Sequence, residues 1–143
     1  MKTHAAALIL ATVVLLAGCA SSKDQLLASS KSQVALRSIQ SRAFDTTDRE
    51  KALRTVVAAL QDLGFIIEQA SLPIGSVTGS KRGQIPEFYI LRMTVSVQPR
   101  GESKLLVRAN AQYNVQEVAD PELYQRFFAA FSKAIFLDAQ QVD

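Results

Sequence analysis

The sequence contains few of the residues from which enzyme and metal centres are commonly built. Of its 143 residues, Cys19 is the only cysteine and His4 is the only histidine. A single cysteine excludes a disulfide within the chain, so packing must stabilise any folded domain.

Excess charge of one sign and long hydrophobic runs are also missing. Sixteen Lys and Arg face 13 Asp and Glu, a balance too even to argue for nucleic acid binding. The stretch from Ala5 to Leu16 is apolar except for Thr12, but it is shorter than the roughly 20 residues that cross a bilayer. No internal repeat is visible. These absences favour one small globular domain.

The amino-terminal residues have the features of an export signal. Lys2 supplies a positive start, an apolar segment follows, and Leu16-Ala17-Gly18-Cys19 comes next. Leu, two small residues and Cys make up the cleavage box of bacterial lipoproteins, and the chain is identified as a member of that class. A plain secretory signal with a chance cysteine, or a short buried helix, is the alternative interpretation.

The lipoprotein resemblance implies that residues 1–18 are a cleaved signal peptide and that the Cys19 sulfur carries a diacylglycerol. Several acyl chains would make membrane attachment effectively permanent. In a Gram-negative source, Ala20 after the cysteine implies the periplasmic face of the outer membrane. No cofactor besides this covalent lipid is expected.

The same resemblance limits the available chemistry, because His4 would leave with the signal and Cys19 would be alkylated. Ser-His-Asp and Cys-His catalysis is then excluded, as are zinc, copper and haem sites built on His or Cys. Carboxylate chemistry and a Ser-Lys pair remain.

Two parts are expected after the signal. Residues 19–38, rich in Ser, Lys, Gln and Ala, are interpreted as the lipidated cysteine and a partly helical tether, and residues 39–143 as one α+β domain. The clearest helix in that domain runs from Thr47 to Leu63. Thr47 and Glu50 form a capping box at its start, and Gly64 ends it in a Schellman pattern that places Phe65 against Leu60.

Strand patterns occupy the middle of the domain. Strands are expected around Ile39–Phe44, Phe65–Ala70 and Ser76–Ser80, with Lys81–Pro86 as a loop. Two long alternating strands follow, joined by a turn at Pro99-Arg100-Gly101-Glu102. Their inward residues are Tyr89, Leu91, Met93, Val95 and Val97 in the first strand, and Leu105, Val107, Ala109, Ala111, Tyr113 and Val115 in the second. One apolar face indicates an antiparallel sheet covered on one side.

A second helix is predicted to begin at Asp120 as cap and Pro121 as first residue. Its apolar face comprises Leu123, Tyr124, Phe127, Phe128, Phe131, Ile135 and Phe136. The order β-α-β-β-β-α predicts a two-layer α+β domain, with an antiparallel sheet and helices on one face. Over Ile39 to Ala139 this order resembles the helix-grip domains of the C-subunit lipoprotein of the outer-membrane barrel assembly machine.

Three sequence patterns have both a functional and a plainer interpretation. Asp45, Asp48 and Glu50 suggest a calcium site or an acid/base pair, but their spacing matches no calcium loop and acids favour a helix start. The segment Gly75–Lys81 resembles a phosphate loop, but its glycines are one residue too close, which favours a β turn. Lys81 and Arg82 suit either an anionic ligand or a solvated loop.

Polar residues alternate with the inward ones on the two long strands. These polar residues form a candidate partner-binding face, which comprises Arg92, Lys104, Arg108, Asn110 and Gln112. Solvent exposure alone is the other explanation for them. With no catalytic or metal residues assigned, we expect a non-enzymatic interaction or assembly module that binds another envelope protein. The alternatives are a carrier of a lipid or small apolar ligand, with a pocket between helix and sheet, and an enzyme using carboxylates or Ser-Lys.

Overall fold

The computed structural model describes residues 32–83 and 89–140. Contacts divide the chain into two units, Met1–Leu36 and Arg37–Asp143. Of the first unit, residues 32–36 are described, and they are helical. The expected signal peptide, the cleavage box and Cys19 lie outside the described residues. The account below concerns the second unit.

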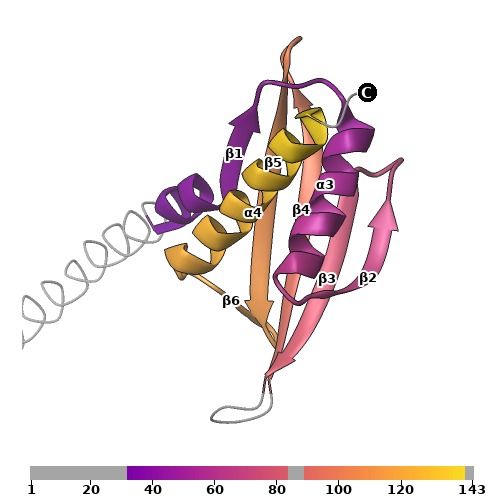
Figure 1. Ribbon diagram of the computed structural model, residues 1–143. Helices are drawn as coiled ribbons and strands as arrows, with labels where there is room; N and C mark the ends of the chain where they lie inside the picture. The colour runs from indigo at the N-terminus through magenta and orange to yellow at the C-terminus, as the bar shows by residue number, and fades with distance from the viewer. Residues whose placement is uncertain (1–31, 84–88, 141–143) are drawn as a thin grey trace, which may run out of the picture. The chain divides into compact units, whose positions relative to one another are not determined.

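The second unit is a two-layer α+β domain, as the sequence predicts (Figure 1). Its sheet has the order β1-β5-β4-β3-β2, every neighbouring pair is antiparallel, and β6 also pairs with β5. Helices α3 and α4 lie together on one face of the sheet. The elements are β1 Ser41–Phe44, α3 Arg49–Asp62, β2 Ile66–Ser71, β3 Ser76–Gly83, β4 Tyr89–Arg100, β5 Lys104–Tyr113, β6 Gln116–Glu117 and α4 Pro121–Gln140.

The elements differ from the expected ones in three places. The four strands expected between the helices are present as β2 to β5, so the summary order β-α-β-β-β-α counted one strand too few, and the two-residue β6 is additional. Residues 37–40 are helical and β1 begins at Ser41, so the expected strand at Ile39–Phe44 is correct only in its second part. Lys81–Gly83, expected in a loop, belongs to β3, because Lys81 and Gly83 pair with Leu91 and Tyr89 of β4.

The alternation in β4 and β5 is confirmed over most of both strands. Leu91 to Val97 on β4 and Leu105 to Ala111 on β5 are buried at every second position. Tyr113 and Val115 were expected to point inward, but they are 43% and 88% exposed. The strand ends at Tyr113, and Asn114 takes a left-handed conformation (φ 53°) that turns the chain toward β6. Alternation therefore stops predicting burial where the strand ends.

Helix α3 ends as predicted but begins differently. Asp48, rather than Thr47, is the N-cap, and its carboxylate accepts a hydrogen bond from the Lys51 amide at 2.9 Å. Glu50 turns outward instead and binds Arg54. At the other end Gly64 has φ 81°, and the Phe65 amide donates to the Leu60 carbonyl at 2.9 Å, which confirms the Schellman pattern.

Helix α4 supplies much of the core. Asp120 accepts a hydrogen bond from the Glu122 amide, as expected of a cap. Tyr124, Phe127, Phe128 and Phe131 are fully buried, and Phe131 meets Phe44 of β1 edge-on at 4.7 Å between ring centroids. Phe136, expected on this face, is 61% exposed. Five residues beyond Phe131, it is rotated by about 140° from the buried stripe.

Arg49 holds the β2–β3 turn against β4. Its Nε donates to the Val97 carbonyl at 3.1 Å and its Nη2 to the Pro73 carbonyl at 3.4 Å. Gly75, at the end of that turn, has φ 75°, and its carbonyl accepts from the Val97 amide. A Cβ at Gly75 would lie 2.0 Å from Arg49 Nη2. The turn therefore needs glycine both for its backbone angle and for its space.

We expect Gly75→Ala to lower the free energy of unfolding by about 2–3 kcal/mol, because it adds backbone strain and displaces the Arg49 guanidinium. Gly101→Ala is the matched control. Gly101 also has positive φ (67°), but nothing lies within 4 Å of the added methyl group, so we expect about 1 kcal/mol. Urea unfolding monitored by circular dichroism measures both values. Equal losses would show that the Arg49 contact contributes nothing.

Candidate interaction surface

The face of the sheet opposite α3 and α4 is a polar surface with its side chains in cross-strand rows. Alternation places the outward residues of β3, β4 and β5 on this side. The strand registers align two central rows, Ser71–Ser76–Ser96–Arg108–Ser41 and Gln69–Thr78–Thr94–Asn110. The Thr78 and Thr94 hydroxyls lie 3.1 Å apart and share a hydrogen bond. We call this surface the open face.

The structure places all five residues of the predicted partner-binding face on the open face. They come from outward positions of β4 and β5, and Arg92 pairs directly across from Gln112. Lys104 lies at the end of β5 farthest from Gln112. The predicted outward placement of these side chains is therefore confirmed. Whether a partner binds there remains a prediction.

Carboxylates form ion pairs with two of these basic side chains, and the sequence analysis predicted neither pairing. Arg92 Nε lies 3.1 Å from Glu68 Oε2, and Lys104 Nζ lies 2.6 Å from Asp45 Oδ1. Glu68 lies at an irregularity of β2, where the register with β3 shifts between Ile67 and Gln69. Such a bulge leaves no alternation signal in the sequence, so the pairing could not be predicted.

Glu68 links three strands on the open face. Its Oε1 accepts a 2.6 Å hydrogen bond from the Ser80 hydroxyl of β3, and its Oε2 accepts from Arg92 of β4. The Ser80 bond, followed by the Arg92 bond, lowers the pKa of the Glu68 carboxyl below its ordinary value. These contacts favour the charged form of the carboxyl. The stability that they contribute is therefore fully present above the ordinary pKa of a glutamate, and it is lost as the pH falls through the lowered pKa of Glu68.

Hydrogen bonds also order the β5 side of the open face. Asn110 Nδ2 donates to Glu117 Oε1 at 3.1 Å, and buried Gln40 donates to the same oxygen. Gln40 also donates to the Tyr124 hydroxyl, which in turn donates to the Val118 carbonyl at 2.6 Å. This network joins the chain before β1 to β6 and α4, and it holds Asn110 in place.

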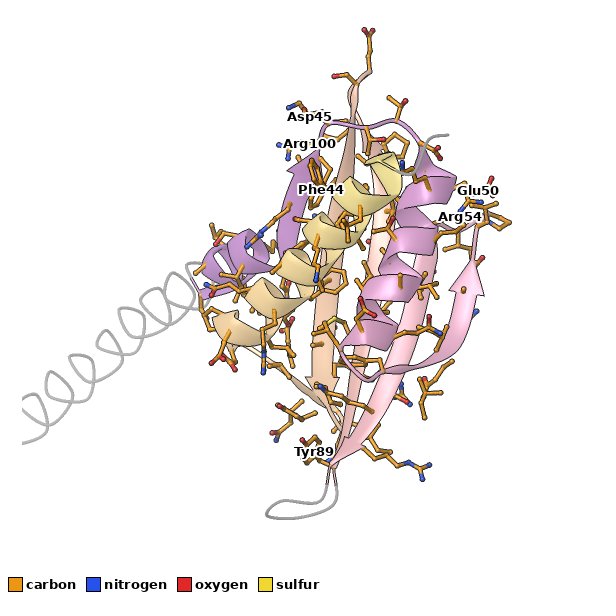
Figure 2. All side chains as sticks on the ribbon, viewed as in Figure 1. Phe44, Asp45, Glu50, Arg54, Tyr89 and Arg100 are labelled. Atoms are coloured by element: carbon orange, nitrogen blue, oxygen red, sulfur yellow. The ribbon has the colours of Figure 1, made fainter. Side chains whose placement is uncertain are left out.

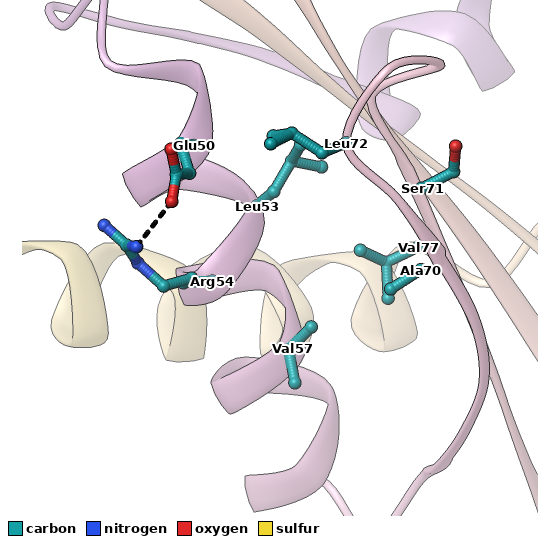
Figure 3. A pocket seen from close by; sticks show the side chains of 8 residues that line it. All are labelled: Glu50, Leu53, Arg54, Val57, Ala70, Ser71, Leu72 and Val77. Atoms are coloured by element: carbon teal, nitrogen blue, oxygen red, sulfur yellow. Dashed lines mark hydrogen bonds and ion pairs between the residues drawn. The ribbon is translucent and has the colours of Figure 1, made fainter.

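An apolar groove lies on the opposite side of the domain, between α3 and the β2–β3 hairpin (Figure 3). It has a volume of about 270 Å³ and is lined by Leu53, Val57, Ala70, Ser71, Leu72 and Val77, with Glu50 and Arg54. The Glu50–Arg54 ion pair of 2.7 Å lies on the exposed side of α3 (Figure 2). This volume lies near the lower end of the usual range for small-molecule sites, and the carrier hypothesis stays a prediction.

The aromatic side chains of α4 pack against one another rather than around a ligand space. The ring centroid of Phe127 lies 5.1 Å from the ring centroid of Phe128 and 6.2 Å from that of Phe131. The Arg42 guanidinium lies over the Phe128 ring at 4.7 Å. Since all three rings are fully buried, the structure assigns the aromatic stripe to the core.

The three acidic residues near the start of α3 have separate partners. Asp45 pairs with Lys104, Asp48 caps the helix, and Glu50 pairs with Arg54. Over residues 32–83 and 89–140, no three His, Cys, Asp or Glu side chains gather as metal ligands. Each of these acidic residues therefore has a separate structural partner, and Asp48 alone acts at the start of the helix.

The phosphate-loop-like segment is mostly strand. Gly75 ends a turn, as expected, but Ser76 to Lys81 pair with β4 throughout. Lys81 is not in a solvated loop. It donates to the Leu63 carbonyl at 3.3 Å and lies 4.8 Å above the Phe65 ring. Burial, followed by the charge of Arg126, lowers the pKa of the Lys81 ammonium.

No protein-family model matches the chain, and no curated protein matches it significantly. In the part of the chain that the structure describes, no helix is both long and apolar enough to span a membrane.

Proposed function

We propose that this protein is a lipid-anchored envelope lipoprotein whose folded domain is a non-catalytic interaction or assembly module. The open face is the observation that supports the role as an interaction module. It is a mostly polar surface whose hydroxyls, amides and charged groups are held in rows by the sheet and by internal hydrogen bonds. A prearranged surface loses little conformational entropy on binding, so it suits recognition of a partner protein.

The anchor part of the proposal rests on Leu16-Ala17-Gly18-Cys19. We propose that Cys19 carries the lipid, that residues 20–38 tether the domain, and that the protein lies on the periplasmic face of the outer membrane. The partner is then another envelope protein, and no cofactor besides the lipid is required. No nucleic acid is involved in this proposal.

Cys19→Ser is expected to abolish lipid attachment and to move the protein out of the membrane fraction, because the acyl chains provide the anchoring free energy. Fractionation and intact-mass analysis measure the change, with Ser21→Ala as the control that retains the cysteine. Cleaved wild-type protein of unmodified mass, or a membrane-bound Cys19→Ser variant, would contradict the anchor.

The interaction role is tested by photocrosslinking in cells. A photoreactive residue at Thr94 lies in a central row of the open face, and one at exposed Ala129 lies on α4. We expect a protein adduct from Thr94 and none from Ala129. No adduct from Thr94, or equal adducts from both positions, would contradict a role for the open face.

A further inference from the structure

The basic side chains of the open face are not equivalent. Ion pairs neutralise Arg92 and Lys104. Three further arginines, Arg82, Arg100 and Arg108, occupy outward positions of β3, β4 and β5. Among the described residues, no carboxylate lies within ion-pair distance of these three guanidinium groups. Glu117, which accepts a hydrogen bond from Asn110, is a further carboxylate on this face. Over the described residues the open face still carries more basic than acidic side chains.

Arg108 is the most central of the three. It lies in the first row, between Ser96 of β4 and Ser41 of β1. Its Nε donates to the Ser41 hydroxyl at 3.2 Å. Within the described residues this is its one side-chain hydrogen bond, so both Nη groups stay available to a ligand. A guanidinium fixed at Nε presents a planar fork that matches a carboxylate.

The neighbours of Arg108 within the two central rows are neutral hydrogen-bonding groups, whereas Leu106, two residues earlier on β5, adds an apolar side chain on the same face. Ser96 lies opposite it across the β4–β5 pair, and Thr94 and Asn110 form the next row. The two central rows hold hydroxyls, amides and one guanidinium, without an aliphatic or aromatic side chain. An anionic lipid surface attracts basic groups by charge. The hydroxyls and amides of these rows add hydrogen-bonding groups at fixed positions, which a protein segment can match, so the rows suit a protein partner.

We propose that the open face binds an acidic segment of a partner protein, with a carboxylate on the Arg108 fork and further acidic groups near Arg82 and Arg100. This inference rests on the proposed interaction function and specifies the partner's chemistry. Complementary charge sets the orientation and speeds the encounter, and a carboxylate between Ser41, Ser96 and Arg108 is recognised by hydrogen bonds as well as by charge.

The experiment uses the full-length lipidated protein with the photoreactive residue at Thr94. Arg108→Glu is expected to lower the adduct yield about tenfold, because it opposes the partner's carboxylates with a like charge. Arg108→Lys keeps the charge without the planar fork, and we expect an intermediate yield. The matched control, Arg126→Glu, makes the same charge change at an exposed position of α4, and it should leave the yield unchanged.

The outcomes separate this inference from the function on which it depends. If the adduct seen with the wild-type protein forms in equal yield with Arg108→Glu, the proposal of an acidic segment is wrong, while the interaction function stands. No wild-type adduct would overturn both. Binding of the lipid-free Cys19→Ser domain to phosphatidylglycerol vesicles, lost in Arg108→Glu but retained in Arg126→Glu, would assign the site to lipid and overturn the protein partner. Equal circular dichroism melting curves for the variants establish that they fold.

Discussion

Phe127→Ala is expected to lower the free energy of unfolding by about 3–5 kcal/mol, the usual cost of truncating a buried phenylalanine. The Phe127 side chain is 0% exposed and contacts the rings of Phe128 and Phe131. Removing it leaves a cavity beneath α4 that rigid strands cannot fill. Since small domains are stable by about 5–15 kcal/mol, this one change removes a large share of the total.

Urea unfolding of the Cys19→Ser form, followed by circular dichroism, measures this loss. Phe136→Ala provides the control on the same helix, because Phe136 is exposed and its truncation should cost less than about 1 kcal/mol. Similar losses for the two variants would mean that the aromatic face of α4 is not the core that the structure describes.

Tyr124→Phe is expected to cost about 2–4 kcal/mol, although it removes a single oxygen. That hydroxyl accepts hydrogen bonds from the Ala111 amide at 3.3 Å and from Gln40, and it donates to the Val118 carbonyl. The substitution leaves buried polar groups without a partner while the ring stays in place. Each unsatisfied group costs about 1–3 kcal/mol, more than the net value of the bond.

Tyr113→Phe makes the same chemical change at a half-exposed position, and its expected cost is below about 0.5 kcal/mol. A double-mutant cycle with Gln40→Leu then measures the coupling between the chain before β1 and α4. We expect a coupling free energy of about 1 kcal/mol. Independent effects of the two substitutions would refute the connection through this hydroxyl.

The predictions from sequence that hold are those that depend on near neighbours in the chain. The Schellman pattern at Gly64 and the Asp120 cap each need only residues within one or two helical turns. The predictions are wrong where two local conformations are both possible. Thr47 and Asp48 are both good caps, and the carboxylate of Asp48 takes the Lys51 amide. The length of β3 likewise depends on the pairing that β4 offers to Lys81–Gly83.

By itself the sequence determined which residues line the two sides of β4 and β5 over residues 91–97 and 105–111, because side chains alternate along a strand whichever strand it pairs with. It also determined that no pair of cysteines can crosslink the fold. Only the tertiary structure decided which charges on the open face remain free. Glu68 reaches Arg92 and Asp45 reaches Lys104 across strands distant in the chain, whereas Arg108 meets the Ser41 hydroxyl. These pairings depend on strand order, register and one bulge, which arise from packing the whole domain rather than from any local pattern.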